Sequence, residues 1–139
     1  MIAGLREAAD IYARGADRRD KAAWRAVLAD DITITGPGFA ISGIEANLGS
    51  IDHLTQAFVA TRHVVHDIDA VIAGDTARGE TRCTAEHRIA GAEGDMLLVW
   101  AIRYQDEWRR DGDRWRFVRR DLVVDWEELR PVRNVGGGA

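Results

Sequence analysis

The sequence predicts a single α+β domain in which N-terminal helices pack on an antiparallel sheet. Near the N-terminus, apolar residues recur at helical spacing, whereas from residue 62 onward they alternate with polar ones as in strands. Turn sequences separate the later segments at hairpin spacing, so the helices precede consecutive strands and do not alternate with them. We expect one domain over residues 1–139, with residues 132–139 as a flexible tail.

The composition excludes several classes of protein. Hydrophobic residues make up 46% of the chain, enough for a core, and the formal net charge is −4. Nucleic-acid-binding modules usually carry a basic face, so we expect no nucleic-acid partner. No apolar run reaches the roughly 18–20 residues of a membrane span. The single cysteine excludes a disulfide framework and a cysteine-based zinc site. We therefore expect a cytoplasmic protein with no membrane partner.

Helices are expected in two parts of the chain. The first 30 residues contain an apolar stripe spaced by three and four residues, formed by Leu5, Ala8, Ala9, Tyr12 and Ala16. Asp20 is a suitable N-cap for a second helix that would bury Trp24, Val27 and Leu28. Residues 42–62 predict one or two short helices, because glycines interrupt an otherwise helical pattern.

Strands account for most of the remaining chain. A short strand at 32–35 ends at a Gly-Pro-Gly turn, and longer strands are expected at 63–73, 80–89, 96–107 and 115–126. In the strand at 80–89, polar residues alternate with a more apolar set that includes Cys83 and His87, which predicts one solvated and one buried face. Alternation in the next strand predicts that Trp100, Ile102 and Tyr104 share one face.

His87 and Asp17 are the first candidates for chemistry. His87 lies on an apolar strand face, and a buried histidine costs free energy unless its ring nitrogens find partners. It is therefore either a core histidine bonded to a neighbour or an acid or base that lines a cavity. Asp17 lies at the edge of the first apolar stripe. It is either a solvated or capping residue, or a carboxylate that orients a histidine.

Two further histidines begin the strand at 63–73. Three residues separate His63 from His66, which puts their rings on opposite strand faces and argues against a two-histidine metal site. Alternation groups His66 with the apolar stripe at 64–72 and favours it as the buried one. His63 would face a cavity only if the strand had a bulge or a late start, or if both faces were covered. The same stripe is a candidate seam between subunits.

The other polar residues have simpler interpretations. Cys83 is expected to be a small buried hydrophobe. The arginines around the last hairpin are interpreted as a solvated or intersubunit face, because acidic residues are mixed among them; they are Arg109, Arg110, Arg119 and Arg120.

Several segments, in this order, resemble the SnoaL-like branch of the nuclear transport factor 2-like superfamily. They are YARGADRRD at 12–20, the strand after Asp30-Asp31, TRH at 61–63, GDTA at 74–77 and DGDRWRFV at 111–118. The resemblance spans residues 3–127. It implies a cone-like fold, in which a strongly curved antiparallel sheet wraps around helices and encloses a pocket.

The resemblance also implies a site like that of scytalone dehydratase. Asp17, His63 and His87 occupy the places of its aspartate and two histidines, with His63 as base or acid and Asp17 holding His87. The tyrosines of the dehydratase are replaced here by Ala16 and Thr35. The expected ligand-binding residues are Tyr12, Tyr104, Trp100, Ile102 and Phe58, with Trp126 as a further pocket wall.

The implied function is that of a cofactor-independent acid–base enzyme of the dehydratase, isomerase or cyclase type. Its substrate would be a small apolar cyclic compound, polyketide-like or steroid-like, and neither a metal nor a cofactor is expected. Two alternatives stay open. One is a non-catalytic module for ligand binding or oligomerisation, and the other is an accessory small subunit of a ring-hydroxylating dioxygenase. Members of this superfamily commonly associate through sheet faces, so a homodimer or homotrimer is expected.

Overall fold

The computed structural model describes residues 2–136 and contains three helices and six strands. The elements are α1 (Ile2–Asp17), α2 (Lys21–Val27), β1 (Leu28–Gly36), β2 (Phe39–Ser42), α3 (Ile44–Ala57), β3 (Ala60–Ala73), β4 (Thr76–Ile89), β5 (Met96–Asp111) and β6 (Arg114–Pro131). Of the predicted tail, residues 132–136 form no helix or strand, and residues 137–139 lie outside the described residues. No helix within residues 2–136 is long and apolar enough to cross a membrane.

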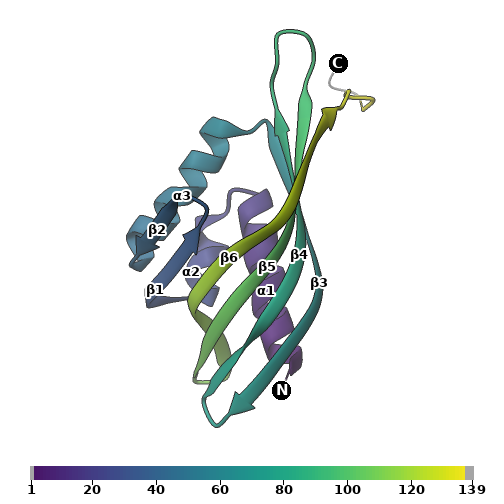
Figure 1. Cartoon of the computed structure of the whole chain (residues 1–139). Helices are drawn as coiled ribbons and strands as arrows, with labels where there is room; N and C mark the ends of the chain where they lie inside the picture. Colours follow the sequence, from purple (N-terminus) through teal and green to yellow (C-terminus); the bar gives the residue numbers. More distant parts are fainter. Residues whose placement is uncertain (1, 137–139) are drawn as a thin grey trace.

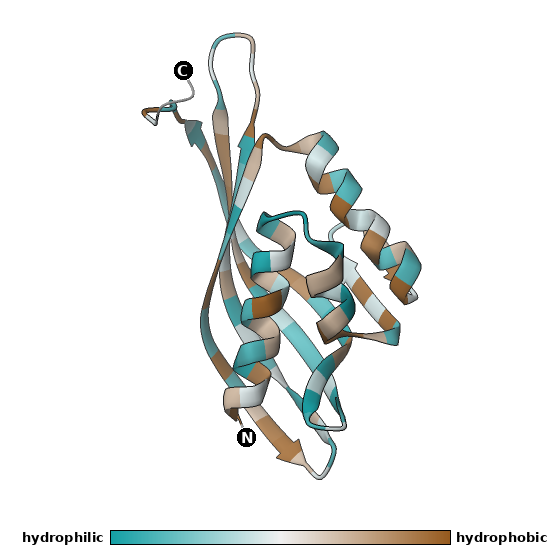
Figure 2. Cartoon of the chain, turned by 180° about the vertical axis from the view of Figure 1, so that it is seen from behind, coloured by the Kyte–Doolittle hydropathy of each residue, from teal (hydrophilic) through white to brown (hydrophobic). Residues whose placement is uncertain are grey.

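The strands form one curved sheet in the order β2-β1-β6-β5-β4-β3, with the helices on one face (Figures 1 and 2). The predicted α+β class is confirmed, but the sheet is mixed, because β1 pairs with β6 in parallel. The prediction of a purely antiparallel sheet is therefore wrong at this pair. After β1 and β2 the chain forms α3 and then β3, β4 and β5. The last strand, β6, then pairs with β1 and runs in the same direction as β1.

The two N-terminal helices form as their sequence predicts. The whole apolar stripe of α1 is buried, including Leu5 and Tyr12. Asp20 caps α2 by accepting a hydrogen bond from the backbone N–H of Ala23 at 3.1 Å. The indole N–H of Trp24 donates to the carbonyl of Tyr12 at 2.9 Å and ties the two helices together. Residues 44–57 form one helix despite the internal Gly49.

A bulge in β3 determines which histidine faces inward. Val65 pairs with Cys83 and Ile68 with Thr81, so β3 has one extra residue between these pairs. Partly buried positions therefore fall at 61, 63 and 65 before the bulge and at 68, 70 and 72 after it. His66 is exposed, so the expectation that it is the buried histidine is wrong. The predicted apolar stripe at 64–72 is divided between the two faces of the sheet for the same reason.

Helix α1 contributes to this bulge through a single side chain. The guanidinium group of Arg6 donates to the carbonyl of Val65 at 3.0 Å and also to that of His66. These carbonyls lie at the shift in register between β3 and β4, so the arginine adds hydrogen bonds to the strand where its pairing is irregular.

A second irregularity moves Trp126 out of the predicted pocket wall. Ala101 pairs with Trp126 and Ile102 pairs with Val124, which leaves one extra residue in β6. Trp126 consequently shares the outer face with Ala101, and it is 71% exposed. The interpretation of Trp126 as a pocket residue is therefore wrong.

The interpretation of the last hairpin as a solvated face fails at Arg120. Its side chain is 1% exposed, and that of its partner Asp106 is 0% exposed. Arg120 donates to the two carboxylate oxygens at 2.8 and 3.0 Å, and the Thr81 hydroxyl donates to the same carboxylate at 2.7 Å. The guanidinium carbon lies 3.7 Å from the ring centroid of Tyr104 and 4.5 Å from that of Tyr12. The charge is thus satisfied within an aromatic core.

Candidate active site

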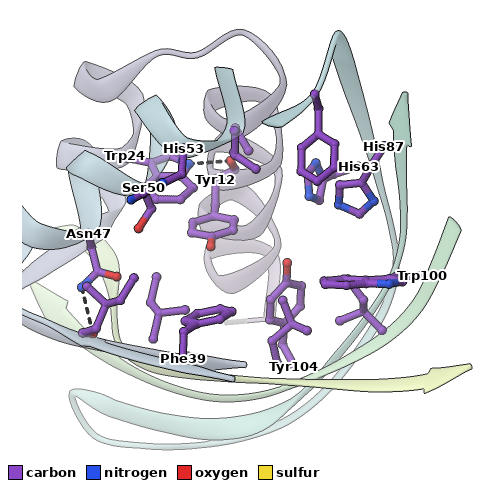
Figure 3. Close-up of a pocket in the computed structure, with 17 residues that line it drawn as sticks. Tyr12, Trp24, Phe39, Asn47, Ser50, His53, His63, His87, Trp100 and Tyr104 are labelled. Carbon is purple, nitrogen blue, oxygen red and sulfur yellow. Dashed lines mark hydrogen bonds between the residues drawn. The ribbon is translucent and has the colours of Figure 1, made fainter. Parts of the chain in front are cut away.

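A cavity of about 390 Å³ lies between the helices and the concave face of the sheet (Figure 3). This volume suits a small organic ligand. Its lining includes each residue predicted to bind a ligand: Tyr12, Tyr104, Trp100, Ile102 and Phe58. Both candidate histidines, His63 and His87, also line it. The structure thus brings residues from α1, α3, β3, β4 and β5 to one cavity.

Asp17 and His63 form the most direct polar contact at this cavity. The Nδ1 atom of His63 lies 2.7 Å from Oδ1 of Asp17, and the backbone N–H of His63 donates to Oδ2 at 2.8 Å. Burial acts to raise the pKa of Asp17, but the hydrogen bonds from the side chain and backbone of His63 outweigh it, so the pKa is below its usual value. An ionised carboxylate only accepts hydrogen bonds, so Nδ1 of His63 carries a proton, and in the neutral form of the ring Nε2 has a free lone pair.

Thr61 and Arg19 hold the Asp17 carboxylate in place. The hydroxyl of Thr61 donates to Oδ1 of Asp17 at 3.0 Å and accepts a hydrogen bond from Arg19 at 2.8 Å. Arg19 also donates to the carbonyl of Ala16 at 2.6 Å, and its backbone has a φ of 55°. This left-handed conformation is uncommon for a residue with a side chain. It lets the turn after α1 close around the carboxylate, a role for Arg19 and Thr61 that the sequence pattern did not indicate.

His87 is held by the neighbouring strand. Its Nδ1 atom lies 3.0 Å from the carbonyl of Leu98, which can only accept, so Nδ1 donates and Nε2 is again unprotonated. The expectation that Asp17 holds His87 is therefore wrong, because the carboxylate bonds to His63. The ring centroid of His87 lies 4.7 Å from that of Phe58 and 5.1 Å from that of Trp100. Burial lowers the pKa of His87, so its ring is mostly neutral at pH 7.

Two tyrosine hydroxyls point into the cavity between the sheet and α3 (Figure 3). Both residues line the cavity. Burial raises the pKa of Tyr12 to about 12 and raises that of Tyr104 above its usual value as well. Both phenols therefore keep their protons at neutral pH and can donate a hydrogen bond to an oxygen of a ligand.

Helix α3 contributes three polar cavity residues that the sequence pattern did not assign to the site: Asn47, Ser50 and His53. His53 is exposed, as expected, although it reaches the cavity lining. Of these three residues, Asn47 is the one that the sequence could have indicated, because it places a polar amide among the apolar positions of its helix. Within residues 2–136, no group of three or more histidine, cysteine, aspartate or glutamate side chains is placed to hold a metal ion.

Solved structures share this fold at low sequence identity. Kfla4162 from Kribbella flavida is 24% identical with a TM-score of 0.83, and 91% of each chain is covered. A type 2 hexachlorocyclohexane dehydrochlorinase is 18% identical with a TM-score of 0.86, over 99% of this chain and 94% of that one. A candidate scytalone dehydratase from Novosphingobium aromaticivorans is 19% identical with a TM-score of 0.79, over 99% and 95%. These likenesses show the fold.

The sequence itself matches a known family. Among curated proteins none matches this chain. The family model described as the SnoaL-like domain matches residues 2–121, which is most of the sequence. The resemblance inferred from the sequence is thereby confirmed, and the chain belongs to the SnoaL-like domain family of the nuclear transport factor 2-like superfamily.

Proposed function

We propose that this protein is a cofactor-independent acid–base enzyme that removes a proton from carbon in a small apolar cyclic substrate. The observation that carries the proposal is the Asp17–His63 contact of 2.7 Å at the wall of a largely apolar cavity. The carboxylate holds the proton on Nδ1, so the Nε2 lone pair of His63 is available as a base. Asp17 also stabilises the imidazolium that forms when His63 takes a proton.

The proposed reaction begins at a carbon next to a carbonyl group. His63 accepts the proton, and the electron pair of the broken C–H bond moves toward the carbonyl oxygen. The hydroxyls of Tyr12 and Tyr104 donate hydrogen bonds to that oxygen, where negative charge develops. His87, which is neutral, accepts a hydrogen bond from a polar group of the substrate and does not compete for the proton.

The step that follows proton removal depends on the substrate. Loss of a hydroxyl group, which takes the proton from the His63 imidazolium and departs as water, gives a dehydratase. Return of the proton at another carbon gives an isomerase, and attack on a second carbonyl gives a cyclase. The structural neighbours named as a dehydrochlorinase and a candidate dehydratase support elimination, because both names describe removal of a small molecule from a substrate.

Hydrogen–deuterium exchange tests the proposal without knowledge of the natural substrate. Cyclic and aryl ketones such as 1-indanone and 2-acetylnaphthalene are incubated with the protein in D₂O, and loss of the α-proton signal is followed by NMR. His63→Gln should slow enzyme-dependent exchange by about 10²–10⁴-fold, the usual contribution of a positioned base. His66→Gln, a change of an exposed histidine on the same strand, should leave the rate unchanged.

Two results would contradict the proposal. One is exchange that continues at the wild-type rate in folded His63→Gln protein. The other is binding of these ketones by the wild-type protein with no exchange above that of buffer alone, which would favour a non-catalytic ligand-binding module.

A further inference from the structure

We infer that the cavity recognises a hydrogen-bond donor on its substrate at the end opposite His63. The substrate class would then be an apolar ring compound with a hydroxyl or N–H group remote from the reacting carbon. Figure 3 shows Asn47 and His63 on opposite sides of the cavity. The inference deepens the proposed function and rests on it for the position of the reacting carbon. The donor site, meaning the place near Asn47 and Ser50 that would bind the donor group of a ligand, can be tested by ligand binding without any measurement of catalysis.

Asn47 presents a buried acceptor with a fixed orientation. The residue is 1% exposed, and its Nδ2 atom lies 2.8 Å from the carbonyl of Gly43 and 3.1 Å from that of Ile41. Rotating the amide by 180° would place its oxygen against these carbonyls, so the nitrogen must occupy this position. The oxygen is consequently directed away from the β1–β2 hairpin, and among residues 2–136 it has no hydrogen-bond partner. An amide oxygen can only accept.

Ser50 adds a second unpaired polar atom on the same side. It lies three residues after Asn47 on α3, a spacing that puts both residues on one helix face, and both line the cavity. A serine inside a helix often donates to the carbonyl four residues earlier. The buried Ser50 hydroxyl makes no such bond and has no partner among residues 2–136. Buried polar atoms are normally paired, so two unpaired ones on a cavity wall indicate a bound polar group.

The surrounding wall restricts the chemistry of that group. Apolar side chains also line the cavity, among them Ile34, Ile41, Leu54 and Leu122. An apolar ring system fits between them. A carboxylate or phosphate is disfavoured, because the Asn47 oxygen would repel it and no lysine or arginine lines the cavity within the described residues. A ketone at this end would leave the acceptor unpaired. A neutral hydroxyl or amine satisfies Asn47 and can also bond to Ser50.

Two ligands that differ in one hydroxyl test this inference. Binding of 6-acetyl-2-naphthol and 2-acetylnaphthalene is compared by quenching of tryptophan fluorescence, since Trp24 and Trp100 line the cavity. The naphthol should bind about tenfold more tightly to the wild-type protein, because its hydroxyl pairs a buried acceptor. Ser50→Ala should reduce this preference, and Asn47→Leu should abolish it. Thr55→Ala, a change on the same helix at a residue outside the cavity lining, should preserve it.

The outcomes separate the donor site from the proposed catalysis. His63→Gln should lose proton exchange and still prefer the naphthol. Asn47→Leu also removes hydrogen bonds to backbone, so Ser50→Ala decides the result if that variant does not fold. Equal affinity of the wild-type protein for the two ligands would overturn the inference. A preference that survives unchanged in Ser50→Ala but disappears in His63→Gln would also overturn it, because the hydroxyl would then bind at the histidines.

Discussion

Asp106 and Asp17 each bind a basic side chain, Arg120 and His63 respectively, but the two pairs differ in how exposed they are. The Asp106–Arg120 pair is sealed in the core, with side-chain exposures of 0% and 1%, and Thr81 completes its hydrogen bonding. The Asp17–His63 pair reaches the cavity through His63, with side-chain exposures of 22% and 9%, and its contact uses the Nδ1 atom of His63. The sealed pair is complete in itself, whereas the open pair keeps one lone pair available for a ligand.

The two pairs are linked through the tyrosines. Arg120 stacks against the rings of Tyr12 and Tyr104, whose hydroxyls face the same cavity as His63. Burial acts to lower the pKa of Arg120, but the Asp106 carboxylate outweighs it and raises the pKa, so the guanidinium remains charged. The sealed pair therefore fixes the positions of the tyrosine rings, and the open pair supplies the base. A substitution in each pair should have a different consequence.

Breaking the sealed pair should have the largest effect on stability. Arg120→Met leaves the Asp106 carboxylate buried without its cation, which should lower the free energy of unfolding by about 3–5 kcal/mol. Urea denaturation measures the change. Combining Arg120→Met with Asp106→Leu should restore much of the loss, because no buried charge then remains. A loss below about 1 kcal/mol in the single variant would show that the pair is not sealed.

Breaking the open pair should affect catalysis more than stability. Asp17→Asn no longer fixes the proton on Nδ1 of His63, so enzyme-dependent α-proton exchange should fall by about 10²–10⁴-fold. Its free energy of unfolding at pH 7 should change less than that of Arg120→Met, since the site borders the cavity. If Asp17→Asn unfolds the protein as severely as Arg120→Met and spares the exchange rate in the folded fraction, the contrast between the pairs fails.

Lowering the pH should remove the contribution of the Asp17–His63 pair to the free energy of unfolding. The folded-state pKa of Asp17 is below its value in the unfolded chain, near 3.9. The unfolded state therefore binds the proton first, so the stabilisation is fully present above about pH 5 and is lost as pH falls through the folded-state pKa. Unfolding measured from pH 6 to pH 2 should show a steeper loss for wild type than for Asp17→Asn. Parallel curves would contradict this assignment.

Protonation of His87 should have a smaller effect on stability, limited to the pH range in which its ring gains a proton. Burial lowers its pKa below the usual 6.5, so at pH 6.5 its ring should be less than half protonated. Titration of its ring protons by NMR measures this directly. The unfolded chain takes up the proton at higher pH than the folded one, so His87 should reduce stability as pH falls below about 6.5. A midpoint above 6.5 would contradict the burial of His87 beside Phe58 and Trp100.

The local parts of this fold could be predicted from the sequence. The α1 stripe, the Asp20 cap and the inward face of β4 with His87 depend on short-range periodicity, and the structure confirms each of them. The order of the family-like segments also predicts the SnoaL-like family, and the family match confirms it. The catalytic roles of Asp17, His63 and His87 stay predictions.

Features that depend on long-range pairing could not be predicted in the same way. An extra residue in β3 reverses the alternation, so His63 faces inward although the pattern favoured His66. Another in β6 turns Trp126 outward. Arg120 looks like a surface residue until Asp106 and the tyrosine rings are placed around it. The choice of His63 over His87 as the partner of Asp17 likewise depends on the turn after α1 and on Thr61.

The tautomer of His63 is the most direct test of the account. Long-range ¹H–¹⁵N correlation spectra of histidine-labelled protein, recorded above the titration range of the ring, distinguish a proton on Nδ1 from one on Nε2. We predict that wild-type His63 carries its proton on Nδ1 and that Asp17→Asn reduces this preference. A wild-type His63 with the proton on Nε2 would contradict the central claim, because the cavity would then face a hydrogen-bond donor in place of a base.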